Sequence, residues 1–208
     1  MTKITTRIIT TENHTEEDIK QISAPMMAYA FSNSPAEEFK PERWAFFTKA
    51  RRTQHFFVLE EDGKPMASAA YQAMRHNLRG HILDWGGIWG VSTYPEARRK
   101  GYAKKIIHDS FVHMNEAGYA ITALYAFKES FYERLGFASW PMPIEVKFKP
   151  ENIKSLMYKD FPGEIERVSF KENLSIFRDY KLKVRTRTHG FCYNEEWSED
   201  PDMITKDS

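Results

Sequence analysis

The sequence predicts an α/β (α+β) fold in which a mixed central sheet is flanked by helices. Segments with the two-residue alternation of strands are interspersed with segments whose apolar residues recur every three or four positions, as in amphipathic helices. In HFFVLEEDGKPMASAAYQAMR, residues 55–75, apolar runs lie on either side of the polar turn Glu61–Lys64, which indicates a hairpin. With 208 residues, 41% of them hydrophobic, the chain suits one full domain plus an extension.

Two helices are predicted between a first strand and this hairpin. Residues 3–10 alternate as a strand does, and Thr15–Asp18 then has the pattern of a helix-capping box. The apolar residues of the helix that follows share one face: Ile19, Ile22, Met26, Met27 and Ala30. A second helix is expected over residues 42–50, where Trp44 and Phe47 are spaced to pack inward.

The segment after the hairpin is an apolar strand rich in glycine. Residues 81–94 read HILDWGGIWGVSTY, with Gly86, Gly87 and Gly90 among large apolar side chains. Glycine inside a strand favours a bulge or the close approach of another backbone. We expect a bulge here, which would separate the neighbouring strands.

The remaining elements of the first domain alternate between helix and strand. An amphipathic helix is predicted from Ala103 to Glu116, stopped by Gly118. It is followed by a short strand in residues 119–127, a short helix in residues 128–137 and a last strand from Ser139 to Phe148.

We place a domain boundary near Pro150. Residues 1–150 form the first domain, and residues 151–208 form a connector, the start of a possible second half and an acidic tail. Within residues 161–191 a strand and a helix follow one another, which echoes the order of the N-terminal elements but hardly their letters. A C-terminal arm that packs on the first domain explains the same residues equally well.

Composition excludes several classes of protein. Lysine and arginine number 30 against 29 aspartate and glutamate, which argues against a general polyanion binder such as a nucleic-acid-binding protein. Cys192 is the only cysteine, and the seven histidines show no ligand-pair spacing, so we expect neither a disulfide nor a metal site. The N-terminus lacks the apolar core of a signal peptide and no run approaches membrane-spanning length, so we expect a cytoplasmic protein.

A basic loop interrupts the pattern between the glycine-rich strand and the next helix. Residues 91–105 read VSTYPEARRKGYAKK, with five cations around Gly101. A helix N-terminus presents unpaired N–H groups and partial positive charge, and glycine brings backbone donors close to a ligand, so the junction suits a pyrophosphate. A solvated basic helix start is the commoner origin of such runs, but cations there oppose the helix dipole. The loop lacks the glycine spacing of a Walker A or dinucleotide motif.

Residues 98–103, RRKGYA, match the signature [QR]-x-x-G-x-[GA] of the GNAT superfamily of N-acetyltransferases. The segment SFYERLGF, residues 130–137, is similar to that family's frequent tyrosine and Gly-Phe element. The resemblance covers about Ile82 to Phe137 and implies a mixed, mostly antiparallel sheet and a site for acetyl-CoA. More narrowly, the chain resembles the N-terminal part of the enhanced intracellular survival (Eis) family, whose members have two GNAT-like halves and are about twice as long.

The resemblance also implies roles for individual residues. Tyr132 would protonate the departing thiolate, since a phenol with a pKa of ~10 stays protonated at neutral pH. A tyrosine that packs in the core is the alternative reading. The general base is left open between Asp84 and a chain of water molecules. The implied cofactor-binding residues are Val91, Ser92, Thr93, Arg98, Arg99, Lys100, Gly101, Tyr102, Ala103 and Lys104.

The function expected from the resemblance is acetyl-CoA-dependent transfer of an acetyl group to a primary amine, such as an aminoglycoside, a lysine or a similar cationic amine. Tyr29, Phe31 and Trp44 lie in the helical segments that commonly roof the acceptor site in this fold, or belong to the core. The alternatives are a non-catalytic acyl-CoA-binding module and an inactive fragment of a longer two-half enzyme. The resemblance also implies a homo-oligomer, hexameric in related proteins. The balanced charge and the lack of a membrane-spanning run lead us to expect no nucleic-acid or membrane partner.

Overall fold

The computed structural model describes residues 2–10, 12–31, 54–140, 145–160, 162–170 and 172–194. The helix expected over residues 42–50, with Trp44, and the acidic tail from residue 195 lie outside the described residues.

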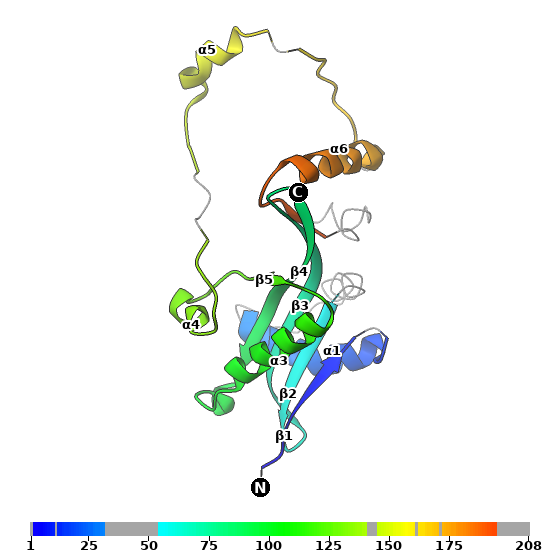
Figure 1. Cartoon of the computed structure of the whole chain (residues 1–208), viewed down its shortest axis with the longest axis vertical. Coiled ribbons are helices and arrows are strands. Elements are labelled where there is room, and N and C mark those ends of the chain that lie inside the picture. Colours follow the sequence, from blue (N-terminus) through cyan, green and yellow to red (C-terminus); the bar gives the residue numbers. More distant parts are fainter. Residues whose placement is uncertain are drawn as a thin grey trace.

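One mixed sheet forms the centre of the fold (Figure 1). Its strands within the described residues are β1 (Ile4–Ile9), β2 (Gln54–Glu61), β3 (Lys64–Leu78), β4 (His81–Thr93), β5 (Ile121–Ala123) and β6 (Cys192–Tyr193). The first five lie in the order β1-β2-β3-β4-β5, and β6 pairs with β3. All pairs are antiparallel except β4 with β5, so the predicted mixed, mostly antiparallel sheet is confirmed.

The predicted hairpin joins β2 to β3 through a two-residue turn. Asp62 and Gly63 both have positive φ, 51° and 78°. Two successive left-handed residues match the right-handed twist of the flanking strands, which is why such turns dominate two-residue hairpins. Asp62 is further held by the residue before β1, because its Oδ1 accepts the N–H of Lys3 at 2.8 Å.

Helices cover both faces of the sheet. The helical segments are α1 (Glu16–Phe31), η2 (Pro95–Ala97), α3 (Tyr102–Glu116), α4 (Glu129–Glu133), η3 (Pro150–Ile153), α5 (Lys154–Met157) and α6 (Leu174–Arg187). Figure 1 shows α3 in front of the strands and α1 behind them. The predicted limits of α1 and α3 agree with the structure to within about a residue.

Alternation along the strands divides the core into two clusters. Phe57 of β2 packs with Ile106 and Ile107 of α3, whereas its neighbour Phe56 packs with Met27 of α1. Successive side chains of a strand point to opposite faces, so β2 is apolar on both. The predicted apolar face of α1 is confirmed at Met26 and Met27, which are 1% and 7% exposed.

Two predicted strands are wrong in the described residues. Residues 139–140 and 145–148 are not in a strand, and Trp140, Val146 and Phe148 are exposed. A strand needs a neighbouring strand edge to pair with. The outer edge of β5 is short, because β5 has only three residues and pairs with β4 along its other edge. The strand expected after residue 161 is also absent from residues 162–170.

The C-terminal segment adds β6 to the sheet. The β3–β4 hairpin extends past β2, and β6 pairs with this extension at Arg75 and His76. Asn77 is 1% exposed, and its carbonyl accepts the N–H of Gly190 at 2.8 Å. Figure 1 shows α6 beside the end of the hairpin and α5 well away from the sheet. The division of the chain near residue 150 stays a prediction.

Candidate active site

Strand β4 continues beyond the short edge strand β5. β4 and β5 pair only from Trp85 to Gly87, where they are parallel. From Ile88 to Thr93 the outer edge of β4 has no partner strand within the described residues. Its backbone N–H and C=O groups can therefore pair with an extended ligand, as a strand added to a sheet edge does.

A bulge at Gly90 lies within this segment of β4. Ala70 is opposite Trp89 and Ser68 is opposite Ser92, so Gly90 and Val91 together face a single residue of β3. Gly90 has φ 64°, a conformation that favours glycine. The bulge predicted from the glycines of this strand is confirmed at this position.

A buried pair of serines fixes the bulge. The hydroxyl of Ser68 donates to the carbonyl of Gly90 at 3.0 Å, and the oxygens of Ser68 and Ser92 are 2.6 Å apart. Because Ser68 has one proton, Ser92 donates to Ser68. Val91 packs on the α3-side core and Ser92 is buried, so β4 can offer a ligand its backbone at these two positions.

The basic loop after β4 has two left-handed residues. Arg99 has φ 64° and Gly101 has φ 81°. A non-glycine residue in this region is uncommon and costs roughly 1–2 kcal/mol, so the fold imposes the conformation of Arg99. Before the loop, the N–H of Tyr94 donates to the carbonyl of Met66 and the side chain of Ala97 is fully buried.

The loop leads directly into the N-terminus of α3. The N–H of Lys105 donates to the carbonyl of Gly101 at 3.0 Å. The N–H groups of Tyr102, Ala103 and Lys104 precede it and have no carbonyl one turn back in the helix. A Cβ built on Gly101 would meet nothing within 4 Å, so the approach to these donors is open. The arrangement suits an anion.

The loop's cationic side chains divide into two groups. Arg98 donates to the hydroxyl of Tyr29 at 2.8 Å, and Lys100 forms an ion pair of 2.7 Å with Glu61. The hydrogen bond raises the pKa of Lys100 and lowers the pKa of Glu61. Arg99 and Lys104 make no side-chain hydrogen bond or ion pair with the described residues, which leaves their charge for an anion.

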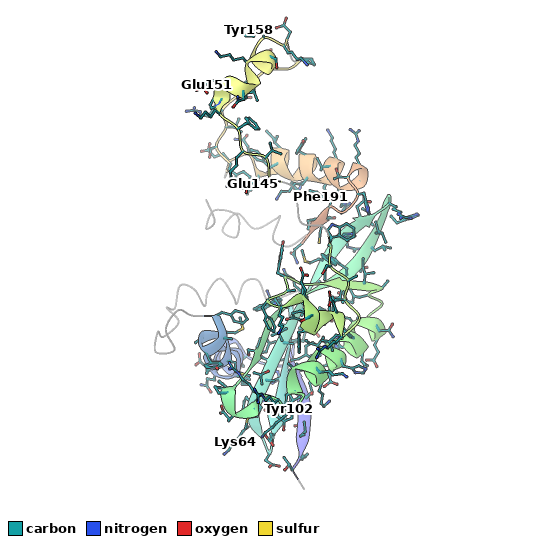
Figure 2. The ribbon with its side chains drawn as sticks, turned by 90° about the vertical axis from the view of Figure 1, so that its left-hand side faces the viewer. Lys64, Tyr102, Glu145, Glu151, Tyr158 and Phe191 are labelled. Carbon is teal, nitrogen blue, oxygen red and sulfur yellow. The ribbon has the colours of Figure 1, made fainter. Side chains whose placement is uncertain are left out.

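Tyr102 plays a structural part in this loop. Its ring is 6% exposed and belongs to the core cluster below α3. Burial, and secondarily Glu61, raise the pKa of its phenol. Tyr102 can therefore contribute its backbone N–H, and not its side chain, to the candidate anion site. Figure 2 shows Tyr102 at the end of the sheet where Lys64 marks the β2–β3 turn.

Tyr132 is buried in α4 among aromatic rings. It is 4% exposed, and the rings of Phe127, Phe131 and Phe137 stand nearly perpendicular to it with centroids 5.0–5.7 Å away. Burial raises the pKa of its phenol, so Tyr132 is protonated at neutral pH. The ring packs in the core, as the reading of Tyr132 as a core residue expects. Its protonated phenol also suits the reading of Tyr132 as a proton donor.

Asp84 is poorly placed to act as a base. Its Oδ1 lies 2.9 Å from Nη1 of Arg75, and it precedes the segment where β4 continues beyond β5. The carboxylate is already engaged by this ion pair, which argues against its use as the base.

A buried polar cluster under α3 was not foreseen from the sequence. The hydroxyl of Tyr71 lies 2.8 Å from Nδ1 of His113, and the ring of His55 stacks on Tyr71 with centroids 4.6 Å apart. Burial, and secondarily His113, lower the pKa of His55 to about 4. These residues come from β2, β3 and α3, so no local sequence signal brings them together.

The fold combines a mixed sheet that opens along one strand with a helix N-terminus beside the opening. Residues 10–139, more than half of the chain, match the acetyltransferase (GNAT) domain family. The chain belongs to that family. No curated protein sequence matches it significantly.

Solved structures agree with this assignment. A conserved protein of Enterococcus faecalis V583, described as a probable N-acyltransferase, is 20% identical with a TM-score of 0.70, over 95% of this chain and 47% of its own. A predicted acetyltransferase of Clostridium acetobutylicum, solved with acetyl-CoA, is 17% identical with a TM-score of 0.56, over 70% of this chain and 96% of its own. An aminoglycoside acetyltransferase from an uncultured soil metagenomic sample, solved with trehalose, is 12% identical with a TM-score of 0.53, over 70% of this chain and 95% of its own.

These likenesses establish the fold. The chain spans about half the length of the Enterococcus protein. In the part that the structure describes, no helix is long and apolar enough to cross a membrane. The described residues also contain no group of three or more histidine, cysteine or carboxylate side chains that could hold a metal ion.

Proposed function

We propose that the chain transfers an acetyl group from acetyl-CoA to a primary amine. The observation that carries this proposal is the continuity of two features. The free edge of β4 leads straight into a loop whose left-handed residues open onto the N-terminus of α3. An extended arm attached to a pyrophosphate is the ligand shape that matches both.

The chain's own residues divide the binding work. The backbone of Val91, Ser92 and Thr93 would pair with the pantetheine arm, because this edge has no partner strand in the described structure. The N–H groups of residues 99–104 would hold the pyrophosphate, with Arg99 and Lys104 adding charge. Arg98 and Lys100 instead brace the loop through Tyr29 and Glu61.

The chemistry requires two proton transfers. The amine nitrogen forms a bond to the acyl carbon as the carbon–sulfur bond breaks, and the sulfur leaves as a thiolate. Tyr132 would give its proton to that thiolate, since the buried phenol is protonated at neutral pH. The proton lost by the amine goes to a base that stays unassigned, and the ion pair of Asp84 with Arg75 favours a water chain.

The subfamily, the acceptor amine, the assembly and the cellular compartment are also part of the proposal. The resemblance to the N-terminal part of the Eis family, whose members have two GNAT-like halves, is kept as a proposal, and the chain spans 47% of the Enterococcus protein. The candidate acceptors are aminoglycosides, lysines and similar amines. The candidate assembly is a homo-oligomer, and the candidate compartment is the cytoplasm.

Thermal unfolding with and without acetyl-CoA tests the binding step. A ligand that binds the native state raises the midpoint, and roughly 100 times its Kd adds about 2.7 kcal/mol. The shift should disappear in the double variant Arg99→Ala/Gly101→Glu. No shift at millimolar acetyl-CoA in the wild type contradicts the proposal for this chain.

Turnover separates the enzyme from its main alternative. A non-catalytic acyl-CoA-binding module gives the thermal shift without release of free CoA in the presence of amines. For the enzyme, Tyr132→Phe should keep the shift and lose roughly 10²–10⁴-fold in kcat, the usual contribution of a general acid.

A further inference from the structure

A buried amide on β3 has no hydrogen-bond partner. Gln72 is 6% exposed, and its Nε2 is shielded from solvent without a partner in the described structure. Buried polar groups are nearly always hydrogen-bonded, because an unpaired one has lost its hydration with no compensation. Such a group in a sheet next to a candidate site points to a ligand.

Gln72 lies beside the point from which β4 continues beyond β5. It is opposite Gly87 in the β3–β4 ladder, and Gly87 is the last residue of β4 that pairs with β5. Under the proposed function, the pantetheine arm runs along β4 from the basic loop toward this point. The acyl end then lies next to Gly87, one strand away from Gln72.

Two tryptophans flank this position on the same face of the sheet. Trp85 and Trp89 are two residues either side of Gly87 and are therefore diagonal neighbours of Gln72. Trp89 packs against the cluster that contains Met27 of α1, so this face is the one opposite α3. A Cβ on Gly87 would lie 2.8 Å from the sulfur of Met74, which places Met74 over the same spot.

The unpaired atoms on this face are mainly donors. Nδ1 of His76 is also buried without a hydrogen-bond partner in the described structure, and its ring contacts that of Trp85 with centroids 5.1 Å apart. The indole N–H of Trp85 has the sulfur of Cys192, a weak acceptor, beside it. An amide nitrogen and an indole nitrogen can only donate, and Nδ1 of histidine donates in one tautomer. The group that completes them must supply oxygen lone pairs.

The C-terminal strand borders this cluster. The sulfur of Cys192 in β6 lies 4.0 Å from the sulfur of Met74, and Nδ2 of Asn194 donates to the carbonyl of Ala73 at 2.8 Å. The segment after residue 150 therefore helps to enclose the donors that the first 150 residues supply.

We propose that Gln72 and Trp85 form an acceptor subsite that selects primary amines carrying hydroxyl, carbonyl or carboxylate oxygens close to the nitrogen. The inference rests on the proposed function, which places the acyl end beside Gly87. An alkylamine or a polyamine offers no oxygen and leaves the amide of Gln72 unpaired. A site built to hydrogen-bond a polar group discriminates strongly against analogues that lack it.

Steady-state acetylation of a matched pair of amines tests the proposal. Glucosamine carries hydroxyl oxygens around its amine, and cyclohexylamine has a ring of the same size without them. The wild type should have a kcat/KM for glucosamine at least tenfold above those for cyclohexylamine and spermidine. Gln72→Met, which is close in volume and has no donor, should reduce this preference about tenfold by lowering kcat/KM for glucosamine.

Gln54→Met is the control for repacking. Gln54 is opposite Gln72 on β2, 7% exposed, and one strand further from β4. Gln54→Met should leave the preference for glucosamine over cyclohexylamine unchanged. An equal preference of the wild type for the two amines, an unchanged preference in Gln72→Met, or an equal loss in Gln54→Met overturns the proposal.

A second measurement works without turnover. The indole N–H resonance of Trp85, assigned by its absence in Trp85→Phe, should shift with glucosamine and not with cyclohexylamine. If acetyl-CoA does not bind, the proposed function fails, and this resonance still reports on the subsite. A resonance that responds equally to both amines overturns the subsite itself.

Discussion

The guanidinium of Arg98 donates a 2.8 Å hydrogen bond to the hydroxyl of Tyr29 and so joins the basic loop to helix α1. Tyr29 also packs against Tyr94, the residue just before η2, with ring centroids 5.6 Å apart. The helix that lies on the candidate acceptor face and the loop that would hold the pyrophosphate are therefore in direct contact. A change in one is expected to affect the other.

Tyr29→Phe tests this coupling. The variant keeps the ring contact with Tyr94 and removes the partner of Arg98, so the loop loses one of its braces. We expect the Kd for acetyl-CoA to rise by about two- to tenfold, the effect of one hydrogen bond of roughly 0.5–1.5 kcal/mol. Titration followed by intrinsic fluorescence or calorimetry measures it.

Tyr125→Phe is the matched control, because Tyr125 is fully exposed. It should leave both the Kd and the unfolding midpoint unchanged. If Tyr29→Phe binds acetyl-CoA as tightly as the wild type does, the link between α1 and the loop has no part in binding.

Gly101→Ala separates the conformation of the loop from its open space. Gly101 has φ 81° and nothing lies within 4 Å of an added Cβ, so the penalty comes from the backbone alone, about 1–2 kcal/mol. If the loop relaxes to relieve this strain, the N–H groups of α3 turn away from the anion. We expect acetyl-CoA to bind about tenfold more weakly, as measured by titration.

Gly118→Ala provides the comparison at the other end of α3. Gly118 has φ 83° and equally open surroundings, so its cost in unfolding free energy should be similar. Its acetyl-CoA affinity should match that of the wild type. A similar loss of affinity in both variants would show that general destabilisation, and not the loop, controls binding.

Sequence patterns predicted the parts of this molecule that depend on local spacing. The β2–β3 hairpin, the bulge at Gly90 and the helix that begins after Gly101 follow from turn residues, glycines and periodicity, and the structure has all three. The strand expected from Ser139 to Phe148 is wrong in its described residues, because a strand also needs a free neighbouring edge.

The polar interior could not be predicted in the same way. Tyr71 and His113 are 42 residues apart, and Gln72 is opposite Gly87 only because of the register of β3 and β4. Neither pairing has a signal in the local sequence. The C-terminal strand β6 has two residues, too few for any alternation to show.

The half-buried His55 of β2 predicts a loss of stability in acid. Burial, and secondarily His113, lower the pKa of His55 to about 4, whereas histidine in the unfolded chain has a pKa near 6.5. Between these values the unfolded state binds more protons, so the stabilisation is complete above pH 6.5 and is lost as the pH falls toward 4. Because the ring is partly exposed, we expect about 1–2 kcal/mol and not the full linkage value.

Urea unfolding at pH 7, 6, 5 and 4.5 measures this loss. His55→Phe keeps a ring on Tyr71 and removes the titrating group, so its unfolding free energy should fall less over the same range. Identical slopes for the variant and the wild type would assign the acid sensitivity to other groups.

Asn77→Ala tests whether the C-terminal segment is integral to the first domain. The side chain of Asn77 donates to the carbonyl of Arg185 and accepts the N–H of Gly80 at 2.8 Å, and its backbone N–H donates to Phe191. Removing a buried amide that joins two segments should cost about 1–3 kcal/mol of unfolding free energy in urea.

The exposed Asn115→Ala is the control and should stay within about 0.5 kcal/mol of the wild type. Hydrogen exchange then distinguishes the two readings of residues 151–208. If the segment packs on the first domain, Asn77→Ala accelerates exchange at residues 190–193 and at Arg75 together, because β6 and β3 share hydrogen bonds. If the segment belongs to a separate half, exchange at Arg75 is unchanged and the docking of β6 contributes little to the stability of the first domain.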